Sequence, residues 1–158
     1  MFVTREADYA VRCVLFLSQE AGRIVSASEI SESMAVSRSF LAKILQRLSK
    51  GGIVRSTQGI AGGFELVRKP DKVSVLEVIE AIQGPAAVNI CAVDEHNCDL
   101  NSTCPVHPVW VELREDIEKK LRKESFTKLI ARKQKLKWST PQVAGNRVQA
   151  TGIAANRK

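Results

Sequence analysis

The sequence predicts a mainly α-helical fold, a winged helix-turn-helix with a two-stranded wing and a long C-terminal dimerisation helix. Three observations support this fold class. Two helical patterns follow each other closely at residues 27–34 and 37–50, as in a helix-turn-helix. Two strand-like segments around a glycine-rich turn come directly afterwards, as expected of a wing. A narrow apolar stripe of helical spacing follows later, at residues 105–123.

The first helix is expected to begin after Thr4 and to run to about Glu20, with apolar residues on or near one face. Cys13 lies in the middle of this helix among apolar residues. Because cysteine without a partner usually behaves as a small buried hydrophobe, we expect Cys13 in the core and not at a metal site. Asp8 lies in the second turn, where a carboxylate is favourable near a helix N-terminus.

The helix-turn-helix begins with a capping-box pattern, Ser26 and Glu29, and its second helix stops at Gly51–Gly52. Residues 33–64 hold five basic residues and no acidic one. A polar, basic side of a second helix is typical of DNA recognition, although many surface helices simply present a solvated basic face. The expected DNA contacts on this helix are Ser37, Arg38, Ser39, Lys43 and Arg47.

The wing is expected as strands at residues 53–56 and 64–67, joined by a turn whose glycines let the backbone approach a phosphate or enter a groove. Three residues, Arg55, Gln58 and Gly59, are expected to place the wing on DNA. A further capping box then opens a helix that ends at Gln83. The expected DNA-binding domain therefore spans residues 1–84.

Three of the four cysteines, Cys91, Cys98 and Cys104, lie in one polar stretch, separated by six and then five residues. His107 follows Cys104 after two residues. If Pro105 is the first residue of a helix, Cys104 is its N-cap and His107 its third residue, so both side chains can face one site. We expect residues 85–104 to form a loop that binds a cofactor.

Several interpretations of these cysteines remain open. An iron–sulfur cluster ranks first, because it is larger than one ion and its thiolates can be spread along a longer loop. Zinc ranks second, since structural zinc sites usually open with two ligands only two to four residues apart. A thiol switch or disulfide ranks third, because three cysteines leave one unpaired. Incidental cysteines in a surface loop rank last.

The helix at residues 105–123 carries apolar side chains at spacings of three and four. We expect it to meet its copy in a homodimer, because the domain before it already has enough apolar residues for its own core. The expected interface residues are Trp110, Leu113, Ile117 and Leu121. A short helix should complete residues 105–131, and residues 132–158 are expected to form a disordered basic tail.

The net charge of +7 arises from the basic residues at positions 125–158. Residues 1–124 hold 16 basic and 17 acidic residues, whereas residues 125–158 hold 8 basic residues and no acidic one. The high isoelectric point is therefore no evidence that the folded part binds nucleic acid.

No run approaches the roughly 18 apolar residues of a membrane span, so we expect a cytoplasmic protein with no membrane partner. The residues show no set of nucleophile, base and orienting group, and we expect no enzyme.

Four segments together resemble a known family: residues 4–12 (TREADYAVR), residues 37–48 (SRSFLAKILQRL), the wing at residues 59–64 and the cysteine loop. Over about residues 1–130 the chain is similar to bacterial Rrf-type regulators of the IscR/NsrR/RirA family. The resemblance implies a homodimer, crossed through the long C-terminal helix, that binds double-stranded DNA. A two-fold protein further predicts a near-palindromic operator. The resemblance also implies an iron–sulfur cluster on the three cysteines, which reads iron–sulfur, redox or nitric-oxide status.

The resemblance points to two fourth ligands. IscR-like members complete a 2Fe-2S site with a histidine three residues after the third cysteine, where this chain has His107. One branch of NsrR-like members completes a 4Fe-4S site with an aspartate from the partner's first helix, where this chain has Asp8. Local spacing favours His107, and His96 ranks behind both. Ala42 stands where IscR-like members have a glutamate in the recognition helix, so their discrimination mechanism does not carry over. Gln58 stands where many members have an arginine before the wing glycine, which argues against an arginine in the minor groove.

Two other functions remain open. A winged-helix regulator without a cluster would use the cysteines as thiol sensors or to hold zinc. An electron carrier would use a cluster on the same cysteines, but this function leaves the winged helix unexplained. Metal analysis and DNA binding distinguish these functions.

Overall fold

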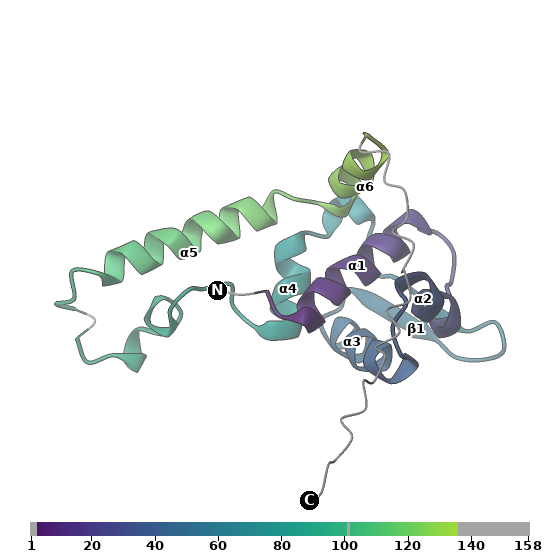
Figure 1. Ribbon diagram of the computed structural model, residues 1–158, viewed down its shortest axis with the longest axis horizontal. Helices are drawn as coiled ribbons and strands as arrows, with labels where there is room; N and C mark the ends of the chain where they lie inside the picture. Colours follow the sequence, from purple (N-terminus) through teal and green to yellow (C-terminus); the bar gives the residue numbers. More distant parts are fainter. Residues whose placement is uncertain (1–2, 101, 136–158) are drawn as a thin grey trace, which may run out of the picture.

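The computed structural model describes residues 3–100 and 102–135, and Figure 1 shows its arrangement. The described part is mainly helical with one two-stranded antiparallel sheet, as the sequence predicts. The elements are α1 (Arg5–Gln19), α2 (Ala27–Met34), α3 (Arg38–Lys50), β1 (Val54–Thr57), β2 (Gly63–Leu66), η1 (Pro70–Lys72), α4 (Val75–Gln83), η2 (Ile90–Ala92), η3 (Glu95–Asn97), α5 (His107–Arg122) and α6 (Phe126–Lys135).

The helix-turn-helix forms because both helix ends are satisfied locally. The Ser31 hydroxyl donates to the Val36 carbonyl at 2.7 Å, and Ala35 takes the left-handed conformation with φ of 52°. Ser37 caps α3, its hydroxyl oxygen accepting from the backbone N–H of Phe40 at 3.3 Å. The Ser37 bond satisfies an N–H at the start of α3, and the Ala35 and Val36 N–H groups donate to the last carbonyls of α2, those of Glu32 and Ser31, at 3.2 Å.

The wing strands pair antiparallel, from Val54 opposite Leu66 to Thr57 opposite Gly63. Each strand is displaced by one residue from its predicted position. Gly63 lies against Val25, and a Cβ added to Gly63 would come within 2.3 Å of the Val25 carbonyl oxygen. This close approach allows Val25 and Phe64 to exchange backbone hydrogen bonds of 3.0 and 2.8 Å. The base of the wing is therefore attached to the helical core.

The core is built from the apolar faces of α1, α3 and α4, and Cys13 is fully buried in it, as predicted. The capping box of Ser74 and Glu77 opens α4, which also confirms the sequence interpretation. Phe126 of α6 is fully buried in the same core. Its backbone N–H donates to the Val73 carbonyl at 3.3 Å. Helix α6, grouped from the sequence with the dimerisation helix, thus packs on the body formed by α1–α4 and the wing.

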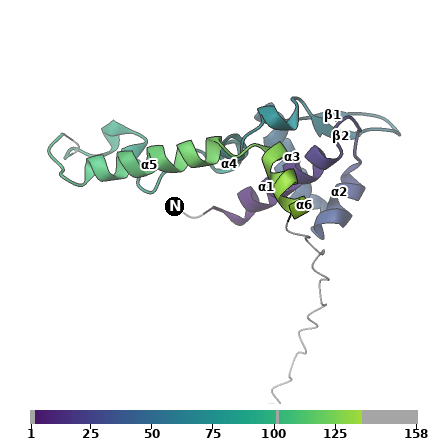
Figure 2. The same ribbon diagram turned by 90° about the horizontal axis from the view of Figure 1, so that it is seen from above.

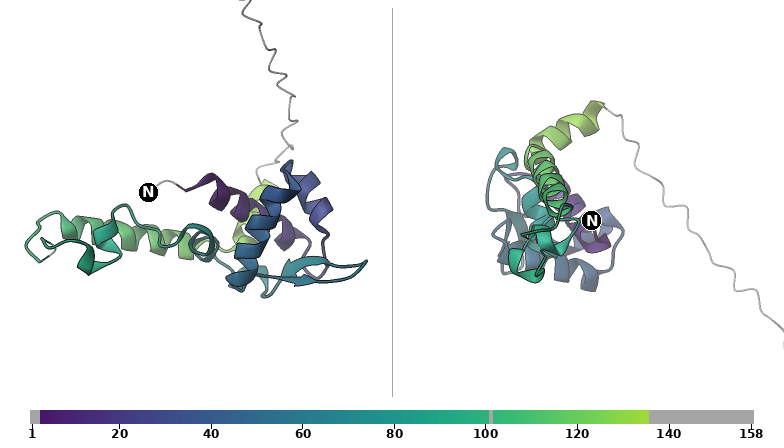
Figure 3. Two further views of the ribbon diagram at one scale, coloured as in Figure 1. Left: turned by 90° about the horizontal axis from the view of Figure 1, so that it is seen from below. Right: turned by 90° about the vertical axis from the view of Figure 1, so that its left-hand side faces the viewer.

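Residues 84–122 leave this body as an arm that ends in the cysteine loop and returns along α5 (Figures 1 and 2). No residue of α5 is buried. Figure 3 shows the wing and the cysteine loop at opposite ends of the molecule. The arm is attached at both of its ends, because α4 precedes it and α6 follows it, and both helices belong to the body.

The start of the long helix differs from its prediction. Helix α5 begins at His107 and not at Pro105, with Pro108 in its first turn, where a missing N–H costs no helical bond. Residues 104–107 form a separate turn, closed by the His107 N–H and the Cys104 carbonyl at 3.3 Å. Cys104 is therefore not the N-cap, and His107 is the first helical residue.

The predicted disordered tail was wrong for residues 132–135, because α6 continues to Lys135. Arg132 pairs with Glu124 at 3.0 Å, which ties this last part of the helix to the segment before it. The rest of the predicted tail, residues 136–158, lies outside the described residues. In the described part, no helix is both long and apolar enough to cross a membrane.

Candidate functional site

The exposed face of α3 carries the polar residues Ser39, Lys43, Gln46 and Lys50. Their spacings of four, three and four residues place them in one row along the helix. The DNA contacts predicted from the sequence include Ser39 and Lys43 but not Gln46 or Lys50. The helical spacing was the signal that could have found them.

A groove runs from this row to the wing, between α3 and β1. It is lined by Ala42, Leu45, Gln46, Ser49, Lys50, Ser56 and Phe64. At the other end of α3, Arg38 is exposed, and the Ser37 and Ser39 hydroxyl oxygens lie 3.3 Å apart. The helix N-terminus and the outward row thus present the exposed cations Arg38, Lys43 and Lys50 beside a groove that is lined in part by the apolar residues Ala42, Leu45 and Phe64.

The two other arginines predicted to meet DNA are engaged within the chain. Arg47 Nη1 donates to Glu6 at 3.1 Å and to the Ile82 carbonyl at 2.8 Å. Arg55 Nε donates to Glu65 across the wing at 2.9 Å, and this bond raises the pKa of Arg55. Both guanidinium groups have carboxylate partners and are therefore less available to phosphate than the exposed side chains of Arg38, Lys43 and Lys50.

The tip of the wing holds no charged residue between Thr57 and Gly63. Gln58 and Gly59 are exposed there, as expected for residues that place the wing. Gly59 has φ of 113°, a conformation that side chains disfavour, and Gly62 could not carry a Cβ, which would lie 2.3 Å from the Thr57 carbonyl oxygen. The glycines therefore shape the turn, and contact with DNA at this tip cannot depend on charge.

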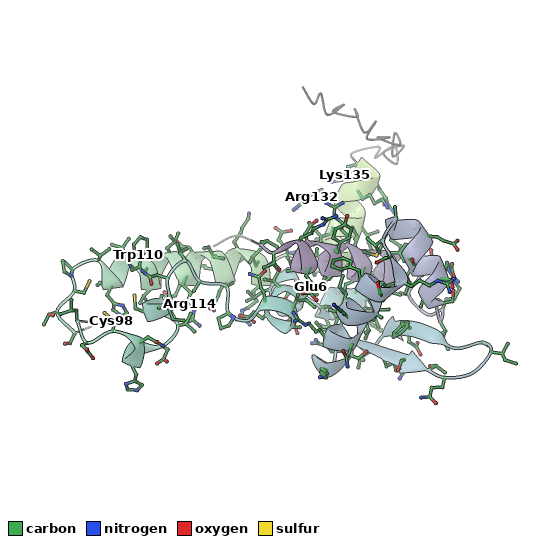
Figure 4. All side chains as sticks on the ribbon, turned by 60° about the horizontal axis from the view of Figure 1, so that its bottom comes forward. Glu6, Cys98, Trp110, Arg114, Arg132 and Lys135 are labelled. Carbon is green, nitrogen blue, oxygen red and sulfur yellow. The ribbon has the colours of Figure 1, made fainter. Side chains whose placement is uncertain are left out.

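The cysteine loop lies at the far end of the arm, where Figure 4 labels Cys98. Cys91 lies in η2, Cys98 directly follows η3, and Cys104 precedes the turn into α5. The three side chains are partly exposed, whereas Cys13 is buried in the core. Burial raises the pKa of the Cys13 thiol to about 12. Among the described residues, no three His, Cys, Asp or Glu side chains are grouped closely enough to hold one metal ion.

His107 has a buried ring nitrogen, Nδ1, with no hydrogen-bond partner in the described part of the chain. Leaving a buried polar atom without a partner costs about 1–3 kcal/mol, and a bound water or ligand at this atom would offset that cost. Its backbone N–H is bonded to Cys104, which keeps the ring beside the end of the loop. His96, in contrast, is exposed.

Asp8, the alternative fourth ligand, lies on α1 and pairs with Arg12 at 3.0 Å. Helix α1 belongs to the body, whereas the cysteines lie at the far end of the arm (Figure 1). A single chain therefore does not bring Asp8 to the thiols.

Arg114, which sequence reasoning did not single out, fastens the cysteine loop to α5. Its Nη1 donates to the Ala92 carbonyl at 2.6 Å, and its Nε donates to Glu118 at 2.6 Å. Glu118 also lies near Glu80 of α4. Burial raises the pKa of Glu80, and the Glu118 carboxylate raises it further. The side chain of Arg114 thus joins the loop to a charged contact between the arm and the body.

The predicted dimer stripe is accessible along α5. Leu113 is 38% exposed, and Trp110, Ile117 and Leu121 are partly exposed. The apolar surface extends past the predicted set, because Val106 and Val109 are 45% and 52% exposed. This surface has no covering element within the described chain.

Comparison with known proteins identifies relatives. The Rrf2 family model, whose description is iron-dependent transcriptional regulator, matches residues 3–132. An HTH-type transcriptional regulator of Aquifex aeolicus is 32% identical over 75% of this chain and 83% of its own length. IscR of Salmonella newport is 30% identical over 98% of this chain and 94% of its own length.

Solved structures share the fold. The structure of T. potens IscR has a TM-score of 0.70 at 22% identity and covers 88% of this chain and 93% of its own. CymR of B. subtilis has a TM-score of 0.66 at 18% identity, covering 84% and 98%. The predicted winged helix-turn-helix is therefore confirmed, and because the relatives are transcriptional regulators, so is the prediction that the chain is no enzyme. The chain belongs to the Rrf2 family of DNA-binding transcriptional regulators.

Proposed function

We propose that this protein is a homodimeric regulator whose binding to a near-palindromic operator is controlled by an iron–sulfur cluster on Cys91, Cys98 and Cys104. His107 is the fourth ligand in this proposal. The observation that carries it is the buried Nδ1 atom of His107, which has no hydrogen-bond partner in the described chain and lies directly after the cysteine loop. An imidazole nitrogen that makes no hydrogen bond is free to ligate a metal in its unprotonated form.

The donor set fits a cluster better than a single ion. Structural zinc sites usually open with two ligands only two to four residues apart, whereas these cysteines are separated by six and then five residues. A cluster spans a larger space and takes thiolates from a longer loop. When bound, a cluster of this kind supplies a centre whose charge changes with redox state. The reducing cytoplasm is the expected location, because thiols and clusters persist there.

The DNA-binding part of the proposal rests on the polar surface of α3. Arg38 is proposed to read a base, because the N-terminal residues of a recognition helix contact base edges. Lys43 and Lys50 are proposed to contact phosphates. A dimer through the α5 stripe would present two such surfaces to half-sites about one helical turn apart.

A regulator without a cluster is the second candidate. It is favoured by one observation, that the three loop cysteines are partly exposed and none is in a disulfide. Such thiols could respond to oxidants directly. An electron carrier is not retained, since it gives no role to the winged helix.

The test is a spectrum and a binding measurement on the same sample. Absorption and Mössbauer spectra of anaerobically purified protein report whether a 2Fe-2S or a 4Fe-4S cluster is present. A DNA duplex selected by the protein from a random library then provides the probe, and its affinity is measured with loaded and metal-free protein. We expect a difference of about tenfold or more, equivalent to ~1.4 kcal/mol. Protein that lacks iron and still binds the duplex in a thiol-dependent way would favour the second candidate.

A further inference from the structure

Arg47 differs from the other cations of α3 in the bonds that it makes inside the chain. One nitrogen, Nη1, donates both to the Glu6 carboxylate at 3.1 Å and to the Ile82 carbonyl at 2.8 Å. Glu6 is only 27% exposed, whereas the arginine side chain is 49% exposed. Arg47 therefore joins the recognition helix to α1 and to α4.

The acceptor in α4 is a backbone group at a helix end. The last four carbonyls of a helix have no partner within the helix and carry the negative end of its dipole. Helix α4 has no basic residue of its own in its last turn. Arg47 supplies from another helix the donor and the positive charge that this helix end lacks.

The same turn is where the chain leaves the body for the arm. Gly84 follows with φ of 82°, a conformation suited to glycine, and the cysteine loop comes next. The Gln83 side chain accepts from the Thr4 N–H at 2.9 Å, so the start of α1 is fastened to the same turn. Figure 4 shows Glu6 on the body, with Cys98 and Arg114 on the arm.

We propose that Arg47 is a positioning residue that sets the recognition helix against the end of α4, and that it is not a phosphate contact. The proposal rests on the proposed function, because it assumes specific DNA binding. In this proposal the Ile82 carbonyl and the Arg47 side chain connect the arm to the recognition helix. A shift of the arm moves the Ile82 carbonyl, and the Arg47 side chain transfers that shift to α3.

The salt dependence of DNA binding separates the two roles. A lost phosphate contact reduces the log–log slope of affinity against salt by roughly one. Arg47→Ala should instead lower affinity by about tenfold with an unchanged slope, because it removes two charge-assisted bonds that position α3. Lys43→Ala is the control on the outward face of the same helix, and its slope should fall by roughly one.

The two roles of Arg47 predict opposite changes in DNA affinity for the Glu6→Gln variant. If Arg47 met phosphate, removing the negative charge beside it would tighten DNA binding. If Arg47 positions α3, the loss of the Glu6 charge leaves only a neutral hydrogen bond and should weaken binding by about threefold, within the range of partly exposed ion pairs. This near-isosteric variant also keeps the test decisive if Arg47→Ala proves too unstable to purify.

The duplex is one selected by the wild-type protein from a random library. Tighter binding by Glu6→Gln, or a slope reduced by about one in Arg47→Ala, would overturn the positioning role. Unchanged affinity in both variants would overturn it as well. A wild-type protein that selects no duplex would instead overturn the proposed function.

Discussion

Arg114 of α5 donates a hydrogen bond of 2.6 Å to the carbonyl oxygen of Ala92, the residue next to Cys91. This bond spans 22 residues of sequence and holds the beginning of the cysteine loop against the arm helix. A loop whose ligands must converge needs such a support, because interactions around the ligands orient them.

Arg114→Ala should loosen the loop without removing a ligand. We expect faster alkylation of Cys91 in metal-free protein and a cluster that is lost several-fold faster, because outer contacts affect metal affinity by about 10–100-fold. Mass spectrometry after timed alkylation measures the first effect. Arg122→Ala is the control, since Arg122 is 65% exposed and lies 3.8 Å from its carboxylate partner. Equal alkylation rates in the two variants would contradict the role of Arg114.

The three loop cysteines should differ from Cys13 in iron binding. Alanine at Cys91, Cys98 or Cys104 should remove most bound iron and sulfide, measured chemically on anaerobic protein. Cys13→Ala should keep both and should lower the free energy of unfolding by about 1 kcal/mol, because it leaves a small cavity in the core. Full iron content in Cys98→Ala would rule out the proposed ligand set.

The fourth ligand can be assigned by two substitutions. His107→Ala should reduce cluster content or shift its absorption spectrum, whereas Asp8→Ala should change neither. Asp8→Ala also breaks the exposed pair with Arg12, which should cost at most about 1 kcal/mol of stability. The reverse result would assign the ligand to Asp8, which would have to come from a partner chain because α1 belongs to the body.

Sequence preference and salt dependence should separate the residues on α3. Arg38→Ala should cost about 1–3 kcal/mol at one base position and relax the preference there. Lys50→Ala should weaken binding to all duplexes alike and reduce the salt slope by about one. A library selection with each variant measures the preference. An unchanged preference in Arg38→Ala would show that another residue reads the base.

The α5 stripe should hold the dimer together. Glutamate at both Leu113 and Ile117 should give monomers in sedimentation experiments at micromolar concentration, because it places charges in an apolar seam. Alanine at Glu112 and Asp116, two exposed polar residues of the same helix, should leave the dimer intact. A dimer that persists in the double glutamate variant would place the interface elsewhere.

The sequence by itself determined the order of the elements and the starts of α1, α2 and α4. The predicted capping box forms completely at Ser74 and Glu77, whereas Ser26 caps α2 by accepting from the Glu29 N–H. Ser37, predicted to begin its helix, is the N-cap of α3, and the strands of the wing lie within one residue of their expected positions. These signals act over about four residues, so neighbouring residues suffice to read them. The three-cysteine stretch and the polar residues around it could likewise be identified from the sequence, because they are close together along the chain.

The tertiary structure alone decided which charged side chains are available. Arg47 and Lys43 look alike in sequence, but Arg47 finds acceptors 41 and 35 residues away, in Glu6 and Ile82. Arg114 likewise finds Ala92 only after the arm folds back on itself. Such bonds depend on how helices pack, and packing depends on contacts between distant segments. A periodic pattern identifies the face of a helix, but only the folded chain determines which donors on that face already have partners.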